Sequence, residues 1–206
     1  MTADHPFVRS ERAIRESDLL SAERLRVRHQ FSDRLKQRRL AALAMTLQAM
    51  RAKSELFVAN IALEEALVIT RQMQGNVQFV EWRAGYLEIV AHRGFSTEFL
   101  TTFQRVRSSD GCACGRALLQ RRTVLVHDVY YDKRFPALRA VGQEAGFISV
   151  QSTPLISSNG ALLGIISTHG TCGPTDEQLE QIKTLAQRTA NELVRLRARN
   201  ILISRP

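Results

Sequence analysis

The three cysteines and a nearby histidine are the residues of this chain with the greatest intrinsic reactivity. One residue separates Cys112 from Cys114, and two separate His169 from Cys172. Thiolates and imidazoles bind zinc or iron, and thiols can be oxidised through a sulfenic acid to a disulfide. Neither spacing belongs to a well-known metal site, and the odd number of cysteines, 3, gives no disulfide framework. The sequence therefore predicts no metal site and reduced thiols, which are typical of the cytoplasm.

Polar residues on two predicted strands, 149–156 and 161–168, could bind a small molecule. Alternation puts Ser149, Gln151 and Thr153 on one face of the first strand, and Ser167 and His169 on one face of the second. Polar side chains on a covered face need hydrogen-bonding partners, which a polar ligand or water would supply. The alternative is that this face contacts solvent.

Four phenylalanines could roof such a pocket with apolar surface, or could simply belong to the core. Ser96 is a candidate N-cap for a helix that carries two of them. They are Phe95, Phe99, Phe103 and Phe135.

A second predicted helix starts at about Cys112, after the turn Ser109-Asp110-Gly111. A helix start offers free N–H groups and a partial positive charge, so it favours an anionic or carbonyl-bearing ligand if it faces a pocket. Gly111, Cys112 and Cys114 then become candidate binding residues. The alternative is that Asp110 or Ser109 caps the helix and nothing binds.

Two charged residues complete the candidate set. Arg93 could pair with an acidic ligand, or could be an exposed structural residue. Asp128 begins an irregular segment, residues 128–146, in which turn capping is its simpler role.

The chain up to about Gln72 is predicted to be helical, because Pro6 is the single proline and no glycine occurs before Gly75. Apolar residues recur there at alternating steps of three and four, as in a heptad seam with one weak position. The seam could pack on its own domain or pair with a second copy, and we favour the second. Its members are Leu40, Leu43, Leu47, Met50, Ser54, Phe57 and Ile61.

The rest of the chain mixes strands and helices. Strands are predicted near 77–82, 86–91 and 124–126, and Asn159-Gly160 predicts a hairpin turn between the two polar strands. A capping box of Thr175 and Gln178 opens the last helix. The apolar side of that helix is marked by Leu179, Ile182, Leu185, Ala186, Thr189, Leu193 and Leu196.

Three segments in this order resemble the GAF domains found beside bacterial histidine kinases: Arg93-Gly94-Phe95, Cys114-Gly115 and Gln151-Ser152-Thr153-Pro154-Leu155. The resemblance covers about Leu56 to Arg197. It implies an α/β (α+β) fold: a six-stranded antiparallel sheet, with the terminal helices on one face and a pocket on the other. It further implies a homodimer through the N- and C-terminal helices. The expected organisation is a basic helical extension (1–53), a sensory domain (54–200) and a tail (201–206).

Charge and hydropathy narrow the classes of partner. The net charge is +9, and residues 1–53 carry 12 Lys or Arg against 6 Asp or Glu. The basic residues alternate with acidic ones and form no block, so nucleic-acid binding is not favoured. No apolar stretch approaches the roughly 20 residues that a membrane span needs, and the start lacks the apolar segment of a secretory signal. We therefore expect a cytoplasmic protein.

The resemblance predicts a regulatory module rather than an enzyme. A small molecule of unknown identity would close segments 95–103 and 128–146 over the pocket, and the terminal helices would relay this to a dimer interface or a signalling partner. The alternative is a thiol reductase of the free methionine-R-sulfoxide reductase type using Cys114. That class needs a second cysteine in the loop 128–146, which has none, and Cys112 is very near in sequence to replace it. A covalent bilin is not expected, because no cysteine is followed directly by histidine.

Overall fold

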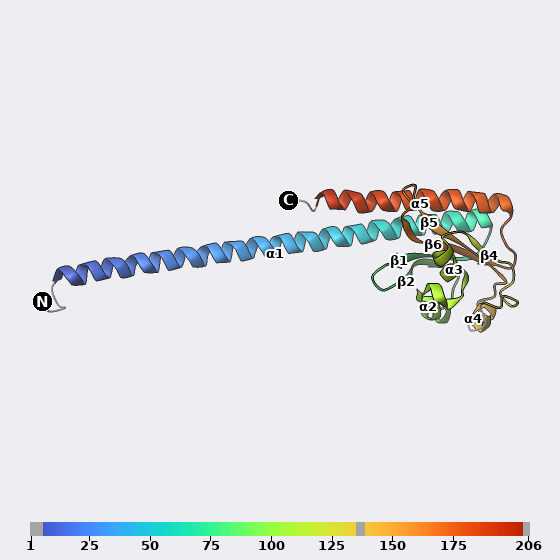
Figure 1. Ribbon diagram of the computed structural model, residues 1–206, viewed down its shortest axis with the longest axis horizontal. Helices are drawn as coiled ribbons and strands as arrows, with labels where there is room; N and C mark the ends of the chain where they lie inside the picture. The colour runs from blue at the N-terminus through green and yellow to red at the C-terminus, as the bar shows by residue number, and fades with distance from the viewer. Residues whose placement is uncertain (1–5, 135–138, 204–206) are drawn as a thin grey trace. The chain divides into compact units, whose positions relative to one another are not determined.

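The computed structural model describes residues 6–134 and 139–203, and the chain divides into two units, Met1–Ala49 and Met50–Pro206. Helix α1 extends over Pro6–Thr70 (Figure 1). In the first unit, Leu40 and Leu43 are 66% and 57% exposed, so no described residue covers this part of the predicted seam. Among the described residues, no helix is long and apolar enough to cross a membrane.

The second unit contains the predicted six-stranded antiparallel sheet, in the order β3-β2-β1-β6-β5-β4. Five of the strands lie where the sequence pattern predicted them. The predicted hairpin at Asn159-Gly160 is confirmed, because it joins the adjacent strands β5 and β6. The two-residue strand β3 was not predicted. The strands are β1 Gln74–Glu81, β2 Tyr86–Arg93, β3 Arg105–Val106, β4 Val124–Val126, β5 Ser149–Ile156 and β6 Leu162–Gly170.

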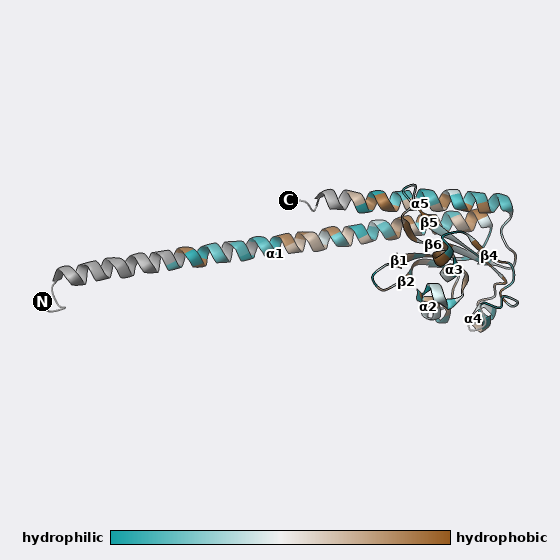
Figure 2. Cartoon of the chain, viewed as in Figure 1, coloured by the Kyte–Doolittle hydropathy of each residue, from teal (hydrophilic) through white to brown (hydrophobic). Residues whose placement is uncertain are grey.

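Helix α5, Asp176–Ile203, and the second-unit part of α1 cover one face of this sheet (Figure 1). Figure 2 shows hydrophobic and hydrophilic residues alternating along α5, as expected of a helix with one buried side. The predicted capping box is present: Thr175 Oγ1 accepts from the N–H of Gln178, and Gln178 Oε1 accepts from the N–H of Thr175. The core of this layer includes Leu63, Val77, Ile166, Ile182 and Leu193.

Short helices cover the opposite face: α2 Thr97–Phe103, α3 Ala113–Gln120 and α4 Arg139–Glu144 (Figure 1). The predicted N-cap of α2 is confirmed, since Ser96 Oγ accepts a 3.2 Å hydrogen bond from the N–H of Phe99. A second apolar core fills this layer, with Leu87, Phe99, Phe103, Phe147 and Ile165 among its buried members. The sheet thus separates a helix-packed face from a face roofed by short elements.

Candidate functional site

A small cavity lies between the roofed face of the sheet and helices α2 and α3. It encloses about 20 Å³, which is roughly the space that one water molecule needs. Strands β1, β5 and β6 form its floor, and α2 and the first turn of α3 form its roof. The lining residues are Asn76, Gln78, Phe99, Phe103, Cys112, Ala113, Cys114, Phe147, Val150, Ser152, Ser167 and His169.

The floor of the cavity is polar, although it is buried. Asn76, Gln78 and His169 are 4%, 1% and 7% exposed. Asn76 Oδ1, Gln78 Oε1 and both ring nitrogens of His169 have no hydrogen-bond partner among the described residues. Beside them, the Ser152 and Ser167 hydroxyls hydrogen-bond each other at 2.8 Å. Because an unsatisfied buried polar atom costs about 1–3 kcal/mol, this cluster calls for a hydrogen-bonding partner in the cavity, which a bound water molecule or a polar ligand would supply.

His169 is held in an aromatic environment at one side of the cavity. Its ring centroid lies 4.6 Å from that of Phe147 and 4.9 Å from that of Phe95, both in edge-on geometry. Burial lowers the pKa of His169 to about 3, because the imidazolium would lose its hydration. The ring is therefore neutral at pH 7 and offers one donor and one acceptor.

The roof is a stack of phenylalanines from α2 and its N-terminal flank. The rings of Phe95 and Phe99 are parallel, with centroids 3.9 Å apart, and Phe103 follows at 4.5 Å from Phe99. Phe99 and Phe103 are buried, whereas Phe95 is partly exposed at the outer end of the stack. Anything larger than a water molecule can enter only if this stack, or α3, moves outward.

The two cysteines of α3 complete the cavity wall. Their sulfur atoms lie 3.4 Å apart. The hydrogen bond from Cys114 lowers the pKa of Cys112, and the same contact raises the pKa of Cys114 well above its usual range. If one of the pair ionises, it is therefore Cys112, and the S–H of Cys114 then donates a hydrogen bond to its thiolate.

Six of the fourteen predicted ligand-binding residues line the cavity, and one more borders it. Those at the wall are Phe99, Phe103, Cys112, Cys114, Ser167 and His169. Phe95 contacts it through its stacking on Phe99.

Three predicted residues of β5 lie on the opposite face of the sheet. The side chain of Ser149 donates to the carbonyl of Val126, while Gln151 donates to Thr153 at 2.5 Å. Gln151 also accepts from Thr168 at 3.0 Å. Gln151, Thr153 and Thr168 thus satisfy one another, and Ser149 is satisfied by the backbone, so the prediction of a cavity-facing position was wrong for Ser149, Gln151 and Thr153. The residue of β5 that reaches the cavity is Ser152.

Three other predicted residues have structural partners away from the cavity. Arg93 is exposed and forms an ion pair with Glu64 of α1. Asp128 Oδ1 accepts from the N–H of Tyr130 at 2.8 Å, which is the turn-capping role. Gly111 has a φ of +75°, and a Cβ there would collide with the carbonyl oxygen of Arg134. Phe135 lies outside the described residues.

The helix start after Gly111 also differs from expectation. The N-cap of α3 is Cys112, rather than Asp110 or Ser109. Asp110 instead accepts from the N–H of Arg107 at 2.8 Å and closes the preceding 3₁₀ turn, Ser108–Asp110. The first turn of α3 is thus free of an acidic cap and lies at the cavity wall.

Six cavity residues were missed by sequence reasoning: Asn76, Gln78, Ala113, Phe147, Val150 and Ser152. The signal for the first two was present, because both share one face of a strand that is otherwise apolar on its neighbouring positions. Within the described part of the chain, no group of three or more His, Cys, Asp or Glu side chains could hold a metal ion.

An antiparallel sheet with long helices on one face and a roofed cavity on the other defines a mixed α/β domain. A sequence model described as GAF domain matches residues 52–193. The chain therefore belongs to the GAF domain family, whose members are commonly signalling or ligand-binding modules. A comparison with curated proteins found no match.

Solved structures share the fold at low sequence identity. A domain of a putative two-component sensor histidine kinase from Sinorhizobium meliloti is 16% identical, with a TM-score of 0.60 over 72% of this chain and 96% of its own. A GAF domain region of a putative membrane protein from Geobacter sulfurreducens is 19% identical, with a TM-score of 0.60 over 72% of this chain and 97% of its own. Free methionine-R-sulfoxide reductase from Neisseria meningitidis, solved with its substrate, is 18% identical, with a TM-score of 0.53 over 78% of this chain and 91% of its own.

Proposed function

We propose that this GAF protein is a regulatory module that binds a small molecule in the roofed cavity and relays its presence through α1 and α5. The observation that carries the proposal is the cluster of unpartnered polar atoms on the cavity floor, from Asn76, Gln78 and His169. A ligand that satisfies them recovers hydrogen bonds that folding alone leaves unmade. Signal transduction in this family and among its structural neighbours supports the same conclusion.

We infer the relay from the sheet itself, because strands β1 and β6 contribute side chains both to the cavity and to the core beneath α1 and α5. Asn76 and Gln78 flank Val77, and Ser167 follows Ile166 in the same way. Val77 and Ile166 are buried in the core beneath α1 and α5, packed with Leu63 and other helix residues. A ligand-induced shift of these strands therefore acts directly on the helix packing. It biases that packing only if the ligand binds the two arrangements with different affinity.

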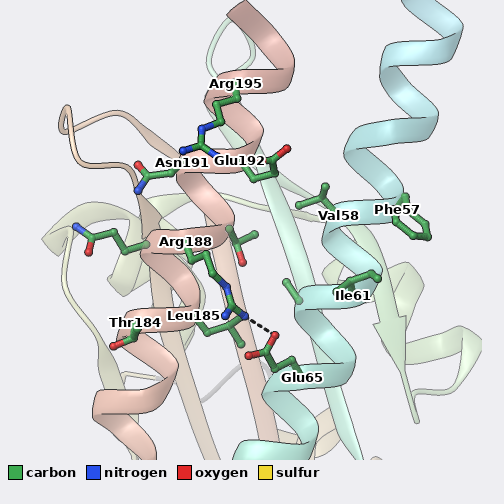
Figure 3. Close-up of a pocket in the computed structure, with 13 residues that line it drawn as sticks. Phe57, Val58, Ile61, Glu65, Thr184, Leu185, Arg188, Asn191, Glu192 and Arg195 are labelled. Carbon is green, nitrogen blue, oxygen red and sulfur yellow. Dashed lines mark hydrogen bonds and ion pairs between the residues drawn. The ribbon is translucent and has the colours of Figure 1, made fainter. Parts of the chain in front are cut away.

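The outer side of the helix pair offers a surface for a second copy of the chain. A groove of about 580 Å³ lies between α1 and α5, with Glu65 and Arg188 ion-paired across it at 2.5 Å (Figure 3). Val58 points toward α5 in this view, while Phe57 projects away from it. Phe57 and Ile61 are 66% and 53% exposed. Apolar side chains beside charges of both signs make a self-complementary patch, as a two-fold dimer interface requires.

The proposal also keeps the organisation expected from the sequence. We keep residues 1–53 as a basic extension, residues 54–200 as the sensory domain and residues 201–206 as a tail, with α5 continuing to Ile203. The helical extension carries the relay to the dimer partner or to another signalling protein, and the protein acts in the cytoplasm.

Native mass spectrometry of freshly purified protein, followed by sedimentation, tests this function. We expect a small molecule to co-purify with the wild-type chain and to be lost from His169→Phe. Returning that molecule to the stripped wild-type protein should change the dimer dissociation constant at least ~5-fold. An unchanged constant at saturating ligand contradicts the relay, and retention by His169→Phe contradicts the site.

A thiol reductase is the second candidate, favoured by the 3.4 Å separation of the Cys112 and Cys114 sulfurs. The direction of the pKa shifts makes Cys112, rather than Cys114, the nucleophile. Its thiolate would take the sulfoxide oxygen and become a sulfenic acid, releasing the thioether. Cys114 would then displace water to form a disulfide, which an external dithiol must reduce.

Turnover of free methionine-R-sulfoxide with a dithiol reductant decides between the candidates. The enzyme hypothesis predicts activity that Cys112→Ser abolishes and that Cys172→Ser, at an exposed cysteine outside the cavity, leaves intact. A sensor shows no activity above the buffer rate, and none of these substitutions changes its oligomeric state.

A further inference from the structure

We propose that the cavity takes an uncharged molecule that carries a primary carboxamide group on a flat aromatic body. This inference rests on the proposed function and names the ligand class of that same site. It follows from three properties of the wall: the absence of charge, the kinds of hydrogen-bonding atoms that lack partners, and the phenylalanine roof.

The wall excludes charged ligands. None of the described residues that line the cavity is Asp, Glu, Lys or Arg, and His169 is neutral because burial lowers its pKa to about 3. An ionised carboxylate or ammonium would be buried here with no countercharge, which is strongly unfavourable. The N-terminus of α3 attracts an anion, but a helix dipole recovers only roughly two- to five-fold in affinity. Desolvation therefore outweighs the dipole, and an anion is rejected.

The unpartnered atoms specify an amide. Asn76 Oδ1 and Gln78 Oε1 are acceptors, so they need two N–H donors, while a neutral His169 ring supplies one donor and one acceptor. A primary carboxamide offers two N–H groups and a carbonyl oxygen attached to the same carbon. The carbonyl can accept from His169 or from the first turn of α3, at Ala113 and Cys114. A hydroxyl alone has one donor and leaves at least one of the two amide oxygens unpaired.

The roof specifies the rest of the molecule. Phe99, Phe103 and Phe147 all contribute to the cavity wall, and aromatic faces and edges favour a flat aromatic partner. The present 20 Å³ does not accommodate such a ring, so binding requires α2 to move away from the sheet. Helix α2 has only seven residues, and Phe95 beside it is partly exposed. We therefore expect α2 to be the part of the roof whose displacement costs the least free energy.

Benzamide and benzoate test the inference, because they share shape and differ in charge at neutral pH. The full chain, labelled with ¹⁵N-histidine, is titrated with each probe while the ring nitrogens of His169 are observed by NMR. We expect benzamide to shift the His169 resonances with a dissociation constant on the order of 1 mM, as suits a fragment of its size. Benzoate should bind at least ~10-fold more weakly.

Two variants show that the binding belongs to this cavity. His169→Phe keeps a ring of similar shape and should weaken benzamide at least ~10-fold, as read from the methyl resonances of Val150. His92→Phe changes an exposed histidine of β2 and should leave the affinity unchanged. If His169→Phe does not fold, Gln78→Leu provides the same test, since it also removes one unpartnered oxygen.

The outcomes separate this inference from the proposed function. Benzoate binding as tightly as benzamide at His169 overturns the ligand class, and so does the absence of any benzamide-induced shift at solubility-limited concentration. Neither result affects the co-purification test, in which a charged or non-aromatic molecule lost from His169→Phe would still support a sensor. An amide preference that survives His169→Phe and Gln78→Leu overturns the assignment to this cavity.

Discussion

Replacing His169 by phenylalanine should remove a specific part of the pH dependence of folding. The pKa of His169 is lowered from 6.5 to about 3 by burial. Above pH 6.5 the ring is neutral in both the folded and the unfolded chain, so it contributes nothing to the pH dependence. Below pH 6.5 His169 binds a proton in the unfolded chain but not in the folded chain. The free energy of unfolding therefore falls until the pH reaches about 3.

The loss of folding stability at pH 5 depends little on how far burial lowers the folded-state pKa of His169. The unfolded histidine is almost fully protonated there, about 1.5 pH units below its pKa, while the folded one remains neutral. One unit corresponds to about 1.4 kcal/mol, so protonation of the unfolded chain costs the wild type about 2 kcal/mol relative to pH 7. A folded-state pKa one unit higher or lower changes this figure by less than about 0.2 kcal/mol.

Urea unfolding of the wild type and of His169→Phe at pH 7 and pH 5 measures the effect. The carboxylates lie outside the cavity wall, so their contribution is common to both proteins and cancels in the difference. The wild type should lose about 2 kcal/mol more than the variant between the two pH values. Equal losses in both proteins would refute the claim that His169 is buried in its neutral form, and with it the description of the cavity floor.

Two further substitutions test the segments that hold α3 in place. Gly111→Ala forces an L-residue into a φ of +75° and drives its Cβ into the Arg134 carbonyl, so it should destabilise the chain by roughly 3 kcal/mol. Gly85→Ala, at a φ of +72° with open space around it, should lose only about 1 kcal/mol, and equal losses in urea unfolding would argue against the collision. Asp132→Asn removes the charge that pairs with Arg116 at 2.6 Å, where both side chains are 12% exposed. A loss of about 3 kcal/mol is expected by thermal or urea unfolding, and a loss below about 0.5 kcal/mol would show that the pair is solvated.

Local chemistry made most of the fold predictable from the sequence. The capping box at Thr175 and the N-cap at Ser96 satisfy backbone groups within a few residues, so their signals survive whatever the tertiary context. Strand β3 was missed because two residues, Arg105 and Val106, are too few to show an alternating pattern. Its position depends on pairing with Leu87 and Glu88 of β2, which sequence periodicity does not report.

The site was harder to predict because it depends on which face of each strand is roofed. Residues 149–153 carry polar side chains at both alternating positions, so the pattern did not distinguish Ser152 from its neighbours Gln151 and Thr153. The structure resolves this through register: Ser152 pairs with Ser167 toward the cavity, while Gln151 pairs with Thr168 beneath the helices. Asn76 and Gln78 share one face of β1 but were overlooked because polar strand positions more often face solvent than a cavity.

The most direct test of whether α1 and α5 link the cavity to a second copy of the chain is sedimentation equilibrium. The wild-type full chain is compared with the Phe57→Ser variant. Phe57 lies on the exposed side of α1, with 66% of its surface accessible, so its truncation should not unfold the sheet. The account predicts a reversible wild-type dimer and a dissociation constant at least ~10-fold weaker in the variant. A wild-type chain that remains monomeric at every concentration would contradict the account.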